Sequence, residues 1–99
     1  MEHTISEQSL VTITKEQISC DLAGETVVLN YKDGAYYGLD TIGAFVWSII
    51  QQPKTVSEIQ SSIINEYAID PKSCEKDLVE LLEQLASRGL VEVKDEKVT

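Results

Sequence analysis

The 99-residue sequence has little of what a catalytic or metal-binding site needs. It holds one histidine, His3, and two cysteines, Cys20 and Cys74, which lack the C-x-x-C spacing of many metal and redox sites. Its five glycines occur singly, so it contains neither a G-x-G-x-x-G nor a Walker phosphate loop. We therefore expect no catalytic residue, no metal and no cofactor, and we expect both cysteines to be buried thiols.

Long apolar runs and an excess of basic residues are also missing. No run approaches the length of a membrane span, and the first residues do not form an export signal, so we expect a cytoplasmic protein without a membrane partner. Eight basic residues stand against 17 acidic ones, which gives a net charge of −9. A surface this acidic repels phosphate backbones and disfavours nucleic acid as a partner.

Three strands are predicted in the first 40 residues. Residues 18–22 alternate apolar and polar side chains, residues 26–31 form a run that contains β-branched and aromatic side chains, and residues 35–39 follow the turn signal Asp33-Gly34. Residues 10–13 and 91–93 are weaker strand candidates. For the hairpin loop we predict three residues with Gly34 left-handed, in preference to two residues, because that register pairs Leu29 with Tyr37 and collects the large apolar side chains on one face.

Three helices follow. The first is predicted over residues 41–51, with Asp40 or Thr41 as its cap and with Trp47 beside the apolar stripe, covering a second contact rather than stacking on a ligand. A Thr55–Glu58 capping box begins the second helix. Asp70 and Pro71 begin the third, and Gly89 ends it in a left-handed conformation.

This order predicts an α+β, winged helix-turn-helix-like fold, in which a small antiparallel β-sheet of about three strands is followed by three α-helices. We expect residues 1–99 to form a single domain, with residues 1–9 and 95–99 flexible. A winged helix suggests DNA binding by analogy alone. The third helix, however, has only three basic residues beside its carboxylates, whereas a helix that reads DNA needs an excess of basic residues. Peptide binding therefore fits better, and a winged-helix transcription regulator is the alternative.

A sheet edge is the feature that could bind a peptide. If residues 35–39 form the last strand, their free backbone groups can accept an added strand, unless the N-terminal segment covers them. Tyr37 and Leu39 would form the apolar floor of this groove, or belong only to the core. The third helix would form the opposite wall, with Glu80 among its residues.

The stretch Tyr36-Tyr37-x-Leu39-Asp40-x-x-Gly43-x-x-Val46-Trp47 resembles the signature of the PqqD-like family. The spacing downstream agrees over about residues 18–93, in the order Thr55-x-x-Glu58-Ile59, Tyr67-x-Ile69-Asp70, Asp77-Leu78, Leu81-Leu82-x-x-Leu85 and Gly89-Leu90-Val91. The resemblance implies a RiPP recognition element, a non-catalytic domain that binds the leader of a ribosomally made precursor by strand addition. The binding residues would be Tyr36, Tyr37, Gly38 and Leu39 by motif, and Val79, Leu82, Glu83 and Ala86 by geometry.

Within that family the chain looks most like the stand-alone leader-binding subunit of the split lasso-peptide protease. The resemblance implies three partners: the precursor leader peptide, a separate cysteine protease subunit and a lasso cyclase. The alternative within the family is a PqqD-type peptide chaperone for a radical SAM enzyme. The acidity of the chain adds the hypothesis that the cognate leader carries basic residues near its hydrophobic anchors, so that its binding weakens as salt is added.

Overall fold

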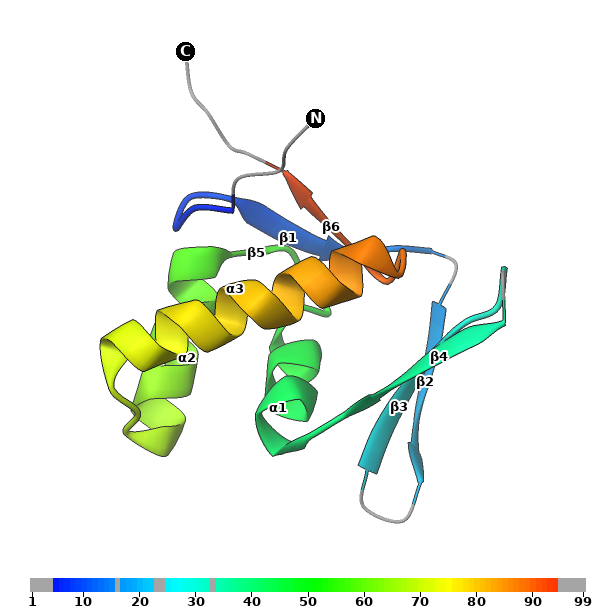
Figure 1. Ribbon diagram of the computed structural model, residues 1–99, viewed down its shortest axis with the longest axis horizontal. Helices are drawn as coiled ribbons and strands as arrows, with labels where there is room; N and C mark the ends of the chain where they lie inside the picture. The colour runs from blue at the N-terminus through cyan, green and yellow to red at the C-terminus, as the bar shows by residue number, and fades with distance from the viewer. Residues whose placement is uncertain (1–4, 16, 23–24, 33, 95–99) are drawn as a thin grey trace.

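A computed structural model describes residues 5–15, 17–22, 25–32 and 34–94 of the chain. Its elements in chain order are β1 (Leu10–Ile13), β2 (Gln17–Leu22), β3 (Glu25–Asn30), β4 (Ala35–Leu39), α1 (Thr41–Ile49), β5 (Lys54–Thr55), α2 (Val56–Tyr67), α3 (Pro71–Ser87) and β6 (Val91–Lys94). Figure 1 shows α3 crossing in front of α1 and α2, with β2, β3 and β4 standing beside α1. The predicted α+β, winged helix-turn-helix-like class is confirmed.

Each helix begins at a predicted cap. The side chains of Asp40 and Asp70 each accept a hydrogen bond from a backbone N–H group in the first turn of α1 and α3. Thr55 and Glu58 form the complete capping box of α2, with bonds of 2.9 and 3.2 Å. These side chains satisfy N–H groups that have no partner within the helix, and so they fix where each helix starts.

The end of α3 also follows the prediction. Gly89 has a φ of 74°, and the N–H of Leu90 donates to the carbonyl of Leu85 over 3.0 Å, as in a Schellman motif. This turn sends the chain back into β6, which confirms the strand predicted at residues 91–93.

The strands form two antiparallel sheets rather than one. One sheet has the order β2-β3-β4, and the other has the order β5-β1-β6. Strand β1 therefore pairs with β5, from the middle of the sequence, and with β6, from its end. The second sheet lies above α3 in Figure 1 and joins the two ends of the described chain.

The predicted hairpin register is wrong. Asn30 pairs with Ala35 and Val28 with Tyr37, so four residues, 31–34, separate β3 from β4. Gly34 is left-handed as expected, with a φ of 77°. The cause is Asn30, which is 6% exposed: its side chain accepts the N–H of Lys32 and donates to the carbonyl of Arg88. These bonds hold a polar residue on the inner face, and Val27 and Leu29 point outward with Tyr36.

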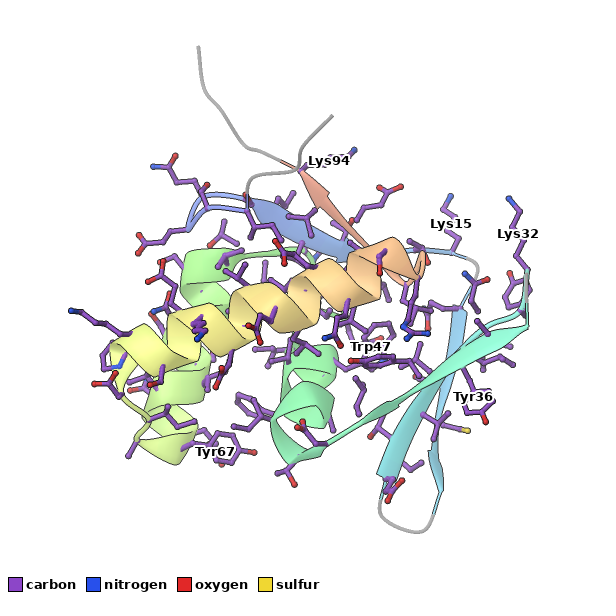
Figure 2. The ribbon with its side chains drawn as sticks, viewed as in Figure 1. Lys15, Lys32, Tyr36, Trp47, Tyr67 and Lys94 are labelled. Carbon is purple, nitrogen blue, oxygen red and sulfur yellow. The ribbon has the colours of Figure 1, made fainter. Side chains whose placement is uncertain are left out.

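The buried side chains form a core between the helices and the inner face of β3 and β4. It includes Val28, Leu39, Val46 and Trp47, with exposures of 0 to 5%. Figure 2 shows Trp47 between α1 and the hairpin sheet, which agrees with a second packing contact. Cys74 is buried, but Cys20 is exposed on β2, so the prediction of two buried thiols is wrong for Cys20.

The N-terminal tail is shorter than expected. Ser9 is 1% exposed, and its carbonyl accepts the N–H of Val56 over 3.0 Å, while the carbonyl of Glu7 accepts the N–H of Ser57. These bonds tie residues 7–9 to the start of α2. Residues 1–4 and 95–99, which we also expected to be flexible, lie outside the described residues.

Candidate functional site

Strand β4 has an unpaired side. It pairs with β3, and no other strand among the described residues pairs with it. The N-terminal β1, which could have covered this edge, pairs instead with β5 and β6. Alternate residues of an edge strand direct their N–H and C=O groups away from the sheet. The outer side of residues 36–39 can therefore accept a further strand.

Tyr37 links this strand to α3. Its side chain lies on the inner face, where its hydroxyl donates a hydrogen bond to Oε1 of Gln84. The guanidinium carbon of Arg88 lies 5.0 Å from the centroid of the Tyr37 ring, within cation–π range. The last two turns of α3 are thus held against β4, and they form one end of a groove beside the free edge.

A pocket of about 290 Å³ opens in this groove; we call it the β4–α3 pocket. Strand β4, the first turns of α1, the C-terminal end of α2 and one flank of α3 all contribute to it. Three half-buried side chains, Ile42, Ile69 and Leu81, leave apolar surface facing its interior. Its lining consists of Tyr37, Asp40, Ile42, Gly43, Val46, Ile63, Ile69, Cys74, Asp77, Leu78, Glu80, Leu81 and Gln84. The pocket is therefore an apolar hollow with carboxylates among its lining residues.

The charge of Asp77 affects a thiol inside the pocket. Burial, and secondly the charge of Asp77, raise the pKa of the Cys74 thiol above its ordinary value of 9.0. The thiol is therefore neutral near pH 7 and is a poor nucleophile. The pocket therefore offers an apolar surface and negative charge, both of which can bind a ligand.

The predicted strand residues all lie on β4, but they face in different directions. Tyr37 points into the groove, and Leu39 is 5% exposed in the core below it. Tyr36 is 71% exposed and points away from the helices in Figure 2. Gly38 is exposed, and a Cβ atom placed on it would have no neighbour within 4 Å. The strand thus contributes the backbone edge of residues 36–39 and one large side chain, Tyr37, to the groove.

Four of the predicted helix residues, Val79, Leu82, Glu83 and Ala86, do not line the β4–α3 pocket. Leu82 is fully buried in the core. Glu83 and Ala86 line a different cavity, of about 600 Å³, together with Ile5 and β6. Val79 precedes them by four and seven residues, so all three share one flank of α3. The structure does not bring this flank together with the β4 edge.

Of the predicted wall residues, Glu80 does line the pocket, as do Cys74 and Leu78 of the buried stripe. The other α3 residues of the lining are Asp77, Leu81 and Gln84. They also follow an i, i+4, i+7 spacing, but on the opposite flank of the buried stripe. Periodicity identifies the stripe and its two flanks without showing which flank faces the strand. The motif gave one further signal, because Asp77 and Leu81 belong to the stretch that resembles the family.

The hairpin sheet has a second exposed surface, on its outer face. Ile18, Leu29 and Tyr36 form a cross-strand row there, and Ile18 is 56% exposed. Nothing among the described residues covers this row.

The described ranges contain neither a cluster of metal ligands nor a membrane-spanning helix. No group of three or more histidine, cysteine or acidic side chains there could hold a metal ion. None of the helices in those ranges combines the length and the apolar character needed to cross a membrane.

Comparisons with known proteins agree on the family. A family model described as coenzyme PQQ synthesis protein D (PqqD) matches residues 25–91. A solved structure described as TbiB1 in complex with the TbiA(beta) leader peptide is 32% identical, covers 89% of this chain and 99% of that chain, and has a TM-score of 0.75. A lasso peptide synthetase B1 complexed with the leader peptide is 17% identical, covers 83% and 96% of the two chains, and shares the fold with a TM-score of 0.74. No curated protein matches the chain.

Proposed function

We propose that this chain, which belongs to the PqqD family, binds the leader segment of a ribosomally synthesised precursor peptide by β-strand addition. The observation that carries this proposal is the unpaired side of β4 next to the β4–α3 pocket. An edge strand supplies main-chain hydrogen bonds to a peptide of any sequence, and a pocket beside it selects side chains. The proposal is supported by the solved structure at 32% identity, which is a complex with a leader peptide.

The added strand would lie between β4 and α3. Its backbone would pair with residues 36–39, and its side chains would alternate between the two faces of the enlarged sheet. Those on the inner face would enter the β4–α3 pocket beside Tyr37 and Leu81. Those on the outer face would stand next to Tyr36.

We assign the binding residues accordingly. The strand residues are Tyr36, Tyr37, Gly38 and Leu39, as predicted from the motif. For the helix wall we replace the flank of Val79, Glu83 and Ala86 with that of Asp77, Leu81 and Gln84, because the latter line the pocket. Leu82 supports the wall from the core.

The bound leader would be presented to enzymes that this chain does not contain. We propose a separate cysteine protease subunit and a lasso cyclase as partners, and a non-catalytic role for the chain itself. The support is the likeness to TbiB1 and to a lasso peptide synthetase B1. A chaperone role for a radical SAM enzyme is the second candidate, favoured by the description of the matched family model. The neighbouring genes distinguish the two candidates. Genes for a lasso cyclase and a cysteine protease would support the first, and a gene for a radical SAM enzyme would support the second.

Isothermal titration with a synthetic leader tests the binding. The leader is the N-terminal segment of the short precursor that we expect to be encoded next to this chain, and we expect a Kd in the micromolar range or tighter. Leu81→Asn places a polar group in the pocket wall without changing charge, and we expect binding at least about tenfold weaker, or about 1.4 kcal/mol.

Val79→Asn is the matched control. Val79 is also half-buried on α3, but it does not line the pocket, so this variant should bind like the unchanged chain. The opposite ranking of the two variants would refute the assignment of the helix wall. Absence of leader binding, together with binding of nonspecific duplex DNA at low salt, would refute the proposed function and favour a transcription regulator.

A further inference from the structure

Three carboxylates gather at the β4–α3 pocket. Asp40 comes from the end of β4, and Asp77 and Glu80 come from α3. All three residues are exposed, so their charges stand at the mouth of the pocket while its apolar walls lie deeper. The positively charged Arg88, the C-cap residue of α3, is held over Tyr37 and is not among the lining residues.

Among the described residues, no lysine or arginine forms an ion pair with these carboxylates. Asp40 accepts a hydrogen bond of 2.8 Å from the N–H of Gly43, which fixes its carboxylate at the start of α1. Neither Asp77 nor Glu80 forms an ion pair with a lysine or arginine in the part of the chain that the structure describes. The charge of Asp77 extends into the pocket, since it contributes to the raised pKa of Cys74 on the pocket floor. The mouth of this pocket is therefore negative, with no cationic partner for Asp77 or Glu80 in the described ranges.

An apolar hollow with a negative mouth matches one class of side chain. Lysine and arginine bury their methylene stems on apolar surface and keep the charged head group at the rim. Ile42, Ile69 and Leu81 would contact the stem, and the carboxylates would accept charge-assisted hydrogen bonds from the head group. Leucine would fill the same walls and leave the carboxylates unpaired.

We propose that the β4–α3 pocket selects a lysine or arginine side chain of the peptide strand added to β4. This inference rests on the proposed leader binding and adds the side-chain class that the site recognises. It also says which acidic residues matter: those at the pocket mouth recognise the basic side chain, and the other acidic residues are not needed for leader binding.

The test combines two double variants with the synthetic leader of the neighbouring precursor. Asp77→Asn with Glu80→Gln removes two negative charges from the pocket mouth. Glu66→Gln with Glu75→Gln removes two from exposed positions that do not line the pocket, and it serves as the matched control. All four side chains are exposed, so both variants should fold, and circular dichroism checks this.

We expect the pocket variant to bind the leader roughly fivefold or more weakly, and the control variant to bind within about twofold of the unchanged chain. In a second series each lysine or arginine of the leader is replaced in turn by glutamine. One replacement should weaken binding to the unchanged chain and have little further effect on the pocket variant, as expected for groups that interact.

Each other outcome has a definite meaning. If the unchanged chain binds the leader but both double variants lose affinity equally, the attraction is a property of the whole surface and the pocket assignment is wrong. A leader without lysine or arginine, or one whose basic residues can all be replaced without loss, overturns the inference and leaves leader binding intact. If the unchanged chain does not bind the leader at all, the proposed function fails first.

Discussion

Single side chains close one end of the candidate site. The hydroxyl of Tyr37 donates to Gln84, and its ring lies beneath Arg88, so one aromatic residue connects the free strand to α3. The tyrosine next to it, Tyr36, points to the opposite face of the sheet. Because neighbouring residues of a strand alternate in direction, the two adjacent tyrosines have different surroundings and would contact side chains on opposite faces of an added strand.

The two cysteines also have different surroundings, and they should therefore differ in their rates of alkylation. With iodoacetamide at pH 8, we expect Cys20 to be alkylated at least about tenfold faster than Cys74, because Cys20 is exposed and the raised pKa of Cys74 lowers its thiolate fraction at every pH. Peptide mass mapping of the native protein measures the two rates. In 6 M guanidinium chloride both should react alike; equal rates in the native state would contradict the buried position of Cys74.

Among the structural elements, the hairpin sheet is attached to the helices through few polar contacts. Asn30 supplies one of them, a bond of 3.1 Å to the carbonyl of Arg88, and it also accepts the N–H of Lys32 in its own hairpin loop over 3.0 Å. Asn30→Ala leaves both groups without this partner, so we expect it to lower the free energy of unfolding by about 1–3 kcal/mol in urea titration.

Asn65 provides the comparison. It is exposed on α2, and Asn65→Ala should change the free energy of unfolding by no more than about 0.5 kcal/mol. If Asn30→Ala were as stable as Asn65→Ala, the bonds of Asn30 would not be what holds the hairpin register.

Elements set by neighbouring residues could be predicted, and those set by distant ones could not. The helices begin at Asp40, Thr55 and Asp70 because each cap bonds to the turn that follows it. The hairpin register depends on Asn30 and on a carbonyl 58 residues away, which no local pattern contains. The pocket-facing flank of α3 was missed for a similar reason, since it depends on how the helix crosses the sheet. The free edge of β4 follows from strand order, and this part of the site was predicted.

For the molecule as a whole, the dominant property is its net charge of −9 on 99 residues. Like charges repel one another more in the compact state than in the unfolded chain, and salt screens them. Raising NaCl from 0.02 to 0.5 M should therefore increase stability, and a gain of about 1 kcal/mol would raise Tm by roughly 4–8 °C. Thermal denaturation followed by circular dichroism measures this, with NaCl used instead of sulfate because excluded salts stabilise most proteins.

Salt should act in the opposite direction on leader binding. If the pocket recognises a basic side chain, the affinity falls over the range in which the protein itself becomes more stable. This opposition separates the two effects, because loss of folded protein could not explain the loss of binding. A Tm that falls with added NaCl would show that local ion pairs outweigh the repulsion.

The turn after α3 couples two positions that lie far apart in the sequence. Gly89 has a φ of 74°, a conformation that asparagine also tolerates, but a Cβ atom there would lie 3.1 Å from the side-chain nitrogen of Asn30. A contact this short requires the amide of Asn30 to shift, and that amide holds the carbonyl of Arg88. A side chain at position 89 would therefore disturb the hairpin anchor as well as the turn, and the effects of substitutions at positions 30 and 89 should not be additive.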